Sequence, residues 1–148
     1  MADGYVVEAA GVTKRFRDSR GGALLTAVDC LDIRAARGKM TALIGPDGAG
    51  KTTFLRMVCG LMFPTEGILS VLGISVADKP ADVQRHLGYM PQKFGLYEDL
   101  TCMENMNLYA DLHGISTEVR RERFEKLFHM TGLAPCAQRL AAKLSGGM

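Results

Sequence analysis

The sequence predicts an α/β fold, and three observations support this prediction. The chain has 148 residues, the size of one domain, and 47% of them are hydrophobic and 23% charged, as in globular proteins. An apolar run at residues 40–44 leads into a glycine-rich loop and then into a helical pattern. After Gln92 the strand-like runs give way to helical patterns. We therefore expect a mixed strand-and-helix part over residues 1–92 and a helical part over residues 93–148.

Five apolar runs are predicted to be strands. Residues 40–44, Met-Thr-Ala-Leu-Ile, lie between a basic turn and a glycine, the pattern of a strand buried on both faces. The other runs are short or partly alternating, and they lie at residues 5–12, 24–33, 68–72 and 87–90.

Helical patterns follow the glycine loop and return after Gln92. The first helix is predicted to begin after the loop and to end at Gly60. Thr101 and Glu104 have the spacing of a capping box, in which each side chain satisfies an unpaired amide of the first turn. A helix is therefore predicted from Thr101 to about Leu112.

A further helix is predicted near the end of the chain. Ser116 or Thr117 would cap it, and Gly132 would stop it. Its apolar residues have the i, i+3, i+4 spacing of one helix face. They are Phe124, Leu127 and Phe128.

Composition and charge exclude several classes of protein. With a formal net charge of +2 and 5 prolines, the chain is not a disordered tail, a collagen or a coiled coil. Its one basic run is interrupted by Asp18 and lacks the clustered excess that a nucleic-acid groove needs, so no nucleic-acid partner is expected. The run consists of Lys14, Arg15, Arg17 and Arg20.

The cysteines and the apolar segments bear on the compartment. The N-terminus has no basic region followed by an apolar stretch, so no secretory signal is expected. Residues 57–77 carry only Glu66 as a charge, but glycines and Pro64 interrupt them, which argues against a membrane span. The cysteines form no C-x-x-C pair, so we expect reduced, buried thiols in a cytoplasmic protein. They are Cys30, Cys59, Cys102 and Cys136.

The glycine loop matches the phosphate-binding pattern G-x-x-x-x-G-K-[ST]. Its glycines let the backbone turn amides inward, and the following helix N-terminus extends this anion nest. Lys51 would reach the β- and γ-phosphates, the Thr52 hydroxyl suits Mg²⁺, and Thr53 can bond the α-phosphate. The predicted nucleotide-binding residues are Gly45, Pro46, Asp47, Gly48, Ala49, Gly50, Lys51, Thr52 and Thr53.

A phosphate loop alone does not distinguish kinases, GTPases and transport ATPases, but the last residues do. Leu-Ser-Gly-Gly-Met at residues 144–148 resembles the signature motif of ATP-binding cassette (ABC) proteins. The Ser145 hydroxyl and the amides of Gly146 and Gly147 at a helix N-terminus would form a second anion site. The resemblance implies that this site faces the γ-phosphate held by a second cassette, so that ATP joins two cassettes head to tail.

Two further segments agree with this resemblance. Gly-Tyr-Met-Pro-Gln at residues 88–92 resembles the family's Q-loop, which implies that Gln92, with Thr52, reaches Mg²⁺ and the attacking water. Residues 12–16 resemble the segment whose aromatic ring stacks on adenine, so Phe16 would stack there, with a core position as the alternative. Asp47 replaces the commoner Asn of the family. Because a carboxylate repels phosphates, we do not expect its side chain to be a phosphate ligand.

Residues 88–112 and the loop are most similar to ATPase subunits of bacterial ABC-2 type multidrug exporters, in particular to the first cassette of tandem-cassette subunits. The resemblance implies a RecA-like P-loop cassette with an N-terminal antiparallel β part and a helical subdomain. It implies MgATP as ligand and a membrane permease that docks near residues 94–101, at the inner face of the cytoplasmic membrane. The permease would form the substrate pocket, so the transported compound is not indicated.

The catalytic groups of the family have no counterpart in these 148 residues. In the family, the signature helix leads to a strand ending in Asp-Glu and then to a switch histidine, which together activate water and sense the γ-phosphate. No such run follows Met148, and no catalytic residue is assignable. The histidines all precede the signature; they are His86, His113 and His129.

We therefore expect the 148 residues to be an incomplete cassette. Residues 40–44 would lack a neighbouring strand, so the isolated chain is expected to be unstable or to aggregate and to hydrolyse ATP negligibly. Two other functions stay open. One is a soluble cassette protein of translation or DNA repair, and the other is a truncated nucleotide-binding or interaction fragment without enzymatic activity.

Overall fold

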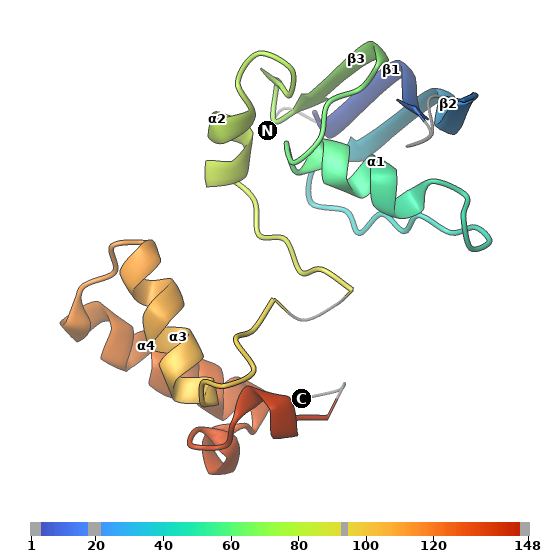
Figure 1. Ribbon diagram of the computed structural model, residues 1–148. Helices are drawn as coiled ribbons and strands as arrows, with labels where there is room; N and C mark the ends of the chain where they lie inside the picture. Colours follow the sequence, from blue (N-terminus) through green and yellow to red (C-terminus); the bar gives the residue numbers. More distant parts are fainter. Residues whose placement is uncertain (1–3, 18–21, 93–94, 146–148) are drawn as a thin grey trace. The chain divides into compact units, whose positions relative to one another are not determined.

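The computed structural model describes residues 4–17, 22–92 and 95–145 (Figure 1). The chain divides into two compact units, Met1–Tyr89 and Met90–Met148. The first unit holds all the strands of the described ranges, and the second is helical. Each unit is described by itself below.

The first unit is built on a four-stranded antiparallel sheet in the order β2-β1-β3-β4. Its strands are β1 (Tyr5–Arg17), β2 (Leu24–Ala36), β3 (Glu66–Val71) and β4 (Ile74–Ser75). The strands predicted at residues 5–12, 24–33 and 68–72 are confirmed, and the first two are longer than predicted. The short strand β4, which pairs only with β3, was not predicted.

Two helices accompany this sheet, α1 (Lys51–Val58) and α2 (Pro80–Arg85). Phe54 and Met57 lie three residues apart on α1, so both point from one helix face into the core. Leu69 and Val71 alternate along β3 and face the same core. The buried cluster that joins sheet and helices consists of Ala9, Val12, Val28, Phe54, Met57, Leu69, Val71, Val76 and Val83.

Two predicted strands are wrong. Residues 40–44 run without ladder partners in the described part of the chain, with Met40 100% and Ile44 90% exposed. Residues 87–90 also form no strand, and Met90 is 93% exposed. An apolar run becomes a strand only when a neighbour takes its backbone hydrogen bonds, and β1 to β4 pair among themselves. Only Leu43 of the first run packs against the core.

The second unit contains α3 (Cys102–Leu112), α4 (Thr117–Thr131) and the short 3₁₀ helices η1 (Ala134–Cys136) and η2 (Ala141–Lys143). The predicted capping box is confirmed. The Thr101 amide donates to Glu104 Oε2 at 2.7 Å, and the Glu104 amide donates to Thr101 Oγ1 at 3.2 Å. The Thr101 hydroxyl also donates to Glu104 Oε2 at 2.8 Å. The hydrogen bonds that the carboxylate accepts from the Thr101 amide and hydroxyl lower the pKa of Glu104.

The last predicted helix is also confirmed, with one difference at its start. Ser116 occupies the N-cap position, but its side chain makes no capping hydrogen bond. Gly132 closes α4 with a φ of +68°, a conformation that glycine adopts without strain.

The cysteines are free thiols, but not all are buried as expected. Cys136 is buried, Cys59 and Cys102 are half-buried, and Cys30 is exposed. Burial raises the pKa of the Cys59 and Cys102 thiols, and the neighbouring Cys136 adds to the effect on Cys102. None of the helices in the described ranges has the length and hydrophobicity of a membrane span.

Candidate nucleotide-binding site

The glycine loop enters α1 through a backbone conformation that β2 imposes. Gly50, the N-cap of α1, has a φ of +83°, and Gly48 has a φ of +81°. A Cβ on Gly50 would lie 2.1 Å from the Ala27 carbonyl oxygen and 3.1 Å from Val28 Cγ2. A Cβ on Gly48 would meet nothing within 4 Å. The second glycine of the motif is therefore required both by its φ and by its contact with β2.

Lys51 folds back over the loop that precedes it. Its Nζ donates hydrogen bonds to the carbonyl oxygens of Gly45 and Pro46, at 2.7 and 2.6 Å. An ammonium group has three donors, so among the described residues these two bonds leave one N–H for a further acceptor. The positive charge is thus held at the loop before any phosphate arrives.

The first turn of α1 favours an anion at the loop. Its leading amides have no acceptor within the helix, and Gly50 has no side chain that could cap them. The first turn also contains no acidic residue, so the helix dipole and Lys51 make this end of the helix positive. The Thr52 hydroxyl is exposed at this end of the helix, and Thr53 is half-buried. These residues fit a polyphosphate with its Mg²⁺.

A hollow of about 440 Å³ lies beside the loop. The loop and α1 form one side of it through Gly48, Gly50 and Lys51, and β2 forms the other side through Val28 and Asp29. The hollow thus extends from the phosphate loop along β2, so a ligand larger than phosphate has room there.

Phe16 lies in the same unit as the loop, near the end of β1. It pairs with Leu25 of β2, just before the stretch of β2 that lines the hollow. The ring is half-buried, and Lys14 Nζ lies over it, 5.4 Å from the ring centroid. An aromatic side chain and the phosphate loop are therefore attached to the same strand pair.

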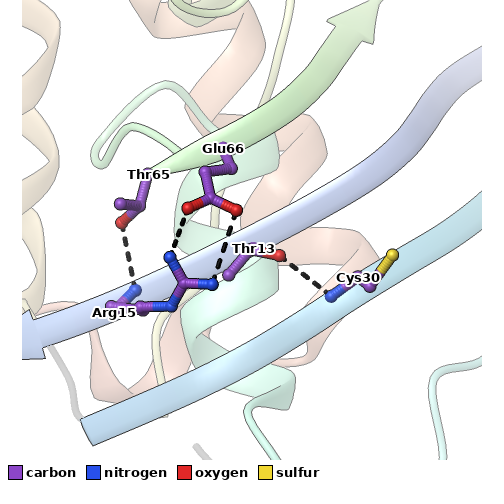
Figure 2. A network of polar contacts seen from close by, with 5 residues as sticks. All are labelled: Thr13, Arg15, Cys30, Thr65 and Glu66. Atoms are coloured by element: carbon purple, nitrogen blue, oxygen red, sulfur yellow. Dashed lines mark hydrogen bonds and ion pairs between the residues drawn. The ribbon is translucent and has the colours of Figure 1, made fainter. Parts of the chain in front are cut away.

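A polar network holds this part of β1, and the sequence analysis missed it (Figure 2). The Arg15 guanidinium forms an ion pair with Glu66, and its backbone amide donates to Thr65 Oγ1 at 3.0 Å. Thr13 is buried, and its hydroxyl accepts from the Cys30 amide at 3.0 Å. The basic residues around Arg15 do not indicate its ion pair, because its partner Glu66 lies 51 positions away in the sequence.

The other predicted site residues are distributed as follows. Asp47 is exposed in the turn of the loop and makes no ion pair within the described ranges. Gln92 and Ser145 belong to the second unit, and both are exposed. Gly146 and Gly147 lie outside the described residues.

The second unit carries a rigidly held segment before α3. Asn105 is 1% exposed, and its Nδ2 donates to the carbonyl oxygens of Tyr97, Leu100 and Thr101 at 3.0, 3.3 and 3.0 Å. Its Oδ1 accepts from the Tyr97 amide at 2.9 Å. Tyr109 adds a hydrogen bond from its hydroxyl to the Gly95 carbonyl. We call residues 95–101 the clasped segment.

An apolar hollow of about 280 Å³ lies beside the clasped segment. It is lined by side chains of the segment and of both long helices, among them Leu96, Met106, Tyr109, Phe124 and Leu127. Leu96 is half-buried in this lining, whereas Tyr97 is 57% exposed.

Comparison with known proteins places this geometry in a family. Residues 28–148 match the family model described as "ABC transporter". The chain is 49% identical over 143 residues to YbhF of Escherichia coli K12, a "Probable multidrug ABC transporter ATP-binding protein". It is 33% identical over 148 residues to DrrA3 of Streptomyces coeruleorubidus, a "Daunorubicin resistance ATP-binding protein".

The match covers nearly all of this chain and only part of each relative. It includes 97% of this chain but 24% of YbhF, and 100% of this chain but 45% of DrrA3. The dimeric ATP-binding cassette MJ0796, solved with ADP and Pi, superposes with a TM-score of 0.82 at 28% identity. That superposition covers 95% of this chain and 63% of the cassette. The chain therefore belongs to the ABC transporter family and spans part of its P-loop ATPase cassette.

Proposed function

We propose that the chain is the nucleotide-gripping part of the ATP-binding subunit of an ABC exporter. The observation that carries this proposal is the loop at Gly50 and Lys51, where β2 excludes any side chain and the lysine ammonium already lies over the loop. The polyphosphate of ATP is the ligand that such a nest suits best.

Each loop residue has a distinct role in this proposal. The Gly48 and Gly50 backbone shapes the nest, the unpaired amides of α1 hold the phosphates, and Lys51 moves from the loop carbonyls to the phosphate oxygens. Mg²⁺, when bound, would neutralise phosphate charge, and Thr52, exposed in the first turn of α1, would hold it through its hydroxyl. Phe16 would stack on the base.

Binding is tested by titrating the chain with ATP and inorganic tripolyphosphate at low protein concentration, where self-association is weakest. Lys51→Ala should lower the affinity for each of the two ligands by about 10-fold or more, since it removes a charge-assisted hydrogen bond to phosphate. The matched control is Lys39→Ala, an exposed lysine before the loop, which should leave both affinities unchanged. Equal affinities in the Lys51 variant and the unaltered chain would refute the proposal.

We propose that hydrolysis requires groups beyond these residues. No carboxylate of the chain follows the signature motif, where the family's catalytic pair would lie. The 148 residues should therefore release phosphate from ATP at a negligible rate. Mg²⁺-dependent release that disappears in Lys51→Ala would contradict this expectation.

The partners follow from the second unit and the relatives. Ser145, Gly146 and Gly147 would contact the ATP held by a second cassette, in line with the dimeric state of MJ0796. The clasped segment and its apolar hollow would receive a membrane permease, which places the protein at the inner face of the cytoplasmic membrane. The similarity to YbhF, a probable multidrug transporter subunit, and to DrrA3, a daunorubicin resistance protein, supports drugs as the transported compounds.

The permease contact has its own test, in cells that carry the complete transporter. Tyr97→Ala removes an exposed ring of the clasped segment and should reduce export while nucleotide affinity stays unchanged. Loss of both properties together would show that the substitution disturbs the fold and not a docking contact. Phe94, also expected at this contact, lies outside the described residues.

Co-purification separates the remaining alternatives. Recovery with a membrane protein supports the exporter, and recovery with ribosomes or DNA supports a soluble cassette protein. Recovery with neither supports a truncated nucleotide-binding or interaction fragment without enzymatic activity.

A further inference from the structure

We propose that Lys14 is a positioning residue for the nucleotide base, holding one face of the Phe16 ring so that the base stacks on the other. This inference rests on the proposed binding of ATP at the loop. It adds a residue that neither the phosphate-loop pattern nor the signature motif contains.

The contact between Lys14 and Phe16 is the first support. Lys14 Nζ lies over the ring at 5.4 Å from its centroid, within the range of a cation–π interaction. The same ammonium donates a hydrogen bond to the Phe63 carbonyl oxygen at 2.8 Å. The charge is therefore tethered above the ring and does not sample the surface as an exposed lysine would.

The neighbouring residue is held by the same segment of chain. Arg15 is bound to Thr65 and Glu66, which follow Phe63 by only a few residues. Residues 63–66 thus fix two consecutive basic side chains of β1, and only Lys14 is directed to the ring. Because Arg15 is neutralised by Glu66, Lys14 is the cation that acts on Phe16.

The strand pairing connects this arrangement to the loop. Lys14 lies opposite Val28 and Phe16 lies opposite Leu25 on β2. Val28 is the residue whose Cγ2 approaches the Gly50 position, and residues 26–29 line the hollow beside the loop. The Phe16 ring and the phosphate loop are therefore both positioned by contacts with residues 25–29 of β2.

The charge of Lys14 acts on the Phe16 ring and, through the ring, on the nucleotide base. The face of an aromatic ring is negative, and a cation on one face draws the π electrons toward itself. The opposite face becomes a better partner for an electron-rich purine, and the ring loses the freedom to turn away from it. Lys14 should therefore influence binding of the base and not binding of the phosphates.

The test compares ATP with inorganic tripolyphosphate in the full chain. Lys14→Met keeps most of the length of the side chain but removes the charge. It should lower the affinity for ATP roughly two- to five-fold, the size of an exposed cation–π contact. Tripolyphosphate affinity should not change, which also shows that the variant is folded at the loop. Lys14→Arg should retain the affinity for ATP, and Lys39→Met serves as the neutralised control.

Two outcomes would overturn the inference. One is an equal loss for ATP and tripolyphosphate in Lys14→Met, which would assign the lysine to phosphate binding or folding, and the other is no loss for ATP. A double-mutant cycle with Phe16→Ala adds a further check, since the Lys14→Met effect should vanish when the ring is absent. The proposed function fails separately, if Lys51→Ala leaves both ligands bound as before.

Discussion

The phosphate loop and the clasped segment are both irregular backbone next to a helix, but they are held in different ways. At the loop, the Gly50 backbone lies against the Ala27 carbonyl, and the charged Nζ of Lys51 donates to loop carbonyls. At the clasped segment, one buried side chain, Asn105, binds the backbone of Tyr97, Leu100 and Thr101. The first arrangement leaves amides open for a ligand, whereas the second satisfies the segment internally. This difference suits a binding loop and a rigid docking surface.

The largest expected effect is at the loop. Gly50→Ala should lower the free energy of unfolding by about 3 kcal/mol or more, since it combines positive-φ strain with a clash against backbone that cannot move aside. Gly48→Ala is the matched control, with the same sign of φ but open space around it, and should cost only about 1 kcal/mol. Urea unfolding measures the free energy of unfolding of both variants. Equal losses of stability would show that β2 does not exclude a side chain at Gly50.

The second effect tests the clasped segment. Asn105→Ala leaves the Tyr97 amide without its acceptor, whereas the carbonyl groups of Tyr97, Leu100 and Thr101 each keep a backbone donor. The loss should cost about 2 kcal/mol in the second unit. Hydrogen exchange at the Tyr97 amide should accelerate with it. Asn107→Ala, on the same helix, removes one long hydrogen bond from Arg120 at 3.4 Å, so it should cost less and leave hydrogen exchange at Tyr97 unchanged. Unchanged exchange at Tyr97 in the Asn105 variant would show that the segment is held by other contacts.

A smaller effect is expected at the capping box that ends the clasped segment. Thr101→Ala should destabilise α3 by about 1 kcal/mol through loss of the N-cap hydroxyl. The pKa of Glu104 is lowered in the folded state, so its contribution is present above the carboxyl's ordinary pKa and is lost as pH falls through the folded value. Thr101→Ala removes the hydroxyl that donates to the Glu104 carboxylate, so the difference between the two unfolding midpoints should shrink from pH 7 to acid conditions. The part due to the bond from the Glu104 amide should remain. A constant difference at all pH values would contradict the assigned hydrogen bonds.

The smallest effect on stability is expected at residues 40–44. Met40→Lys replaces a fully exposed apolar side chain, so the free energy of unfolding should change by less than about 0.5 kcal/mol. Self-association should decrease, because a charge in an unpaired apolar segment blocks edge-to-edge pairing. Sedimentation velocity measures it, with Leu72→Lys as an exposed apolar control outside the segment. If both variants self-associate to the same extent, residues 40–44 do not mediate the self-association of the chain.

Much of the fold was readable from local patterns. The capping box at Thr101 and Glu104 and the glycine stop at Gly132 depend on residues a few positions apart, so the sequence contains all their partners. The phosphate loop is local in the same sense, since its glycines and Lys51 all lie within residues 45–51. The strands at residues 40–44 and 87–90 failed for the opposite reason, because a strand depends on a distant neighbour that a periodic pattern does not name.

The sequence by itself therefore determined the family, the loop pattern and the capped helices. Only the tertiary structure decided that Gly50 must lack a side chain because of Ala27, that Arg15 pairs with Glu66, and that Lys14 covers the Phe16 ring. Gly50 meets Ala27 where the loop packs on β2, and Lys14 is held over the ring by the distant Phe63 carbonyl. The Arg15–Glu66 pair joins β1 to β3, so its distance is set by the register of these two strands. A one-residue change in that register would reverse which side chains face each other, and no local pattern encodes it.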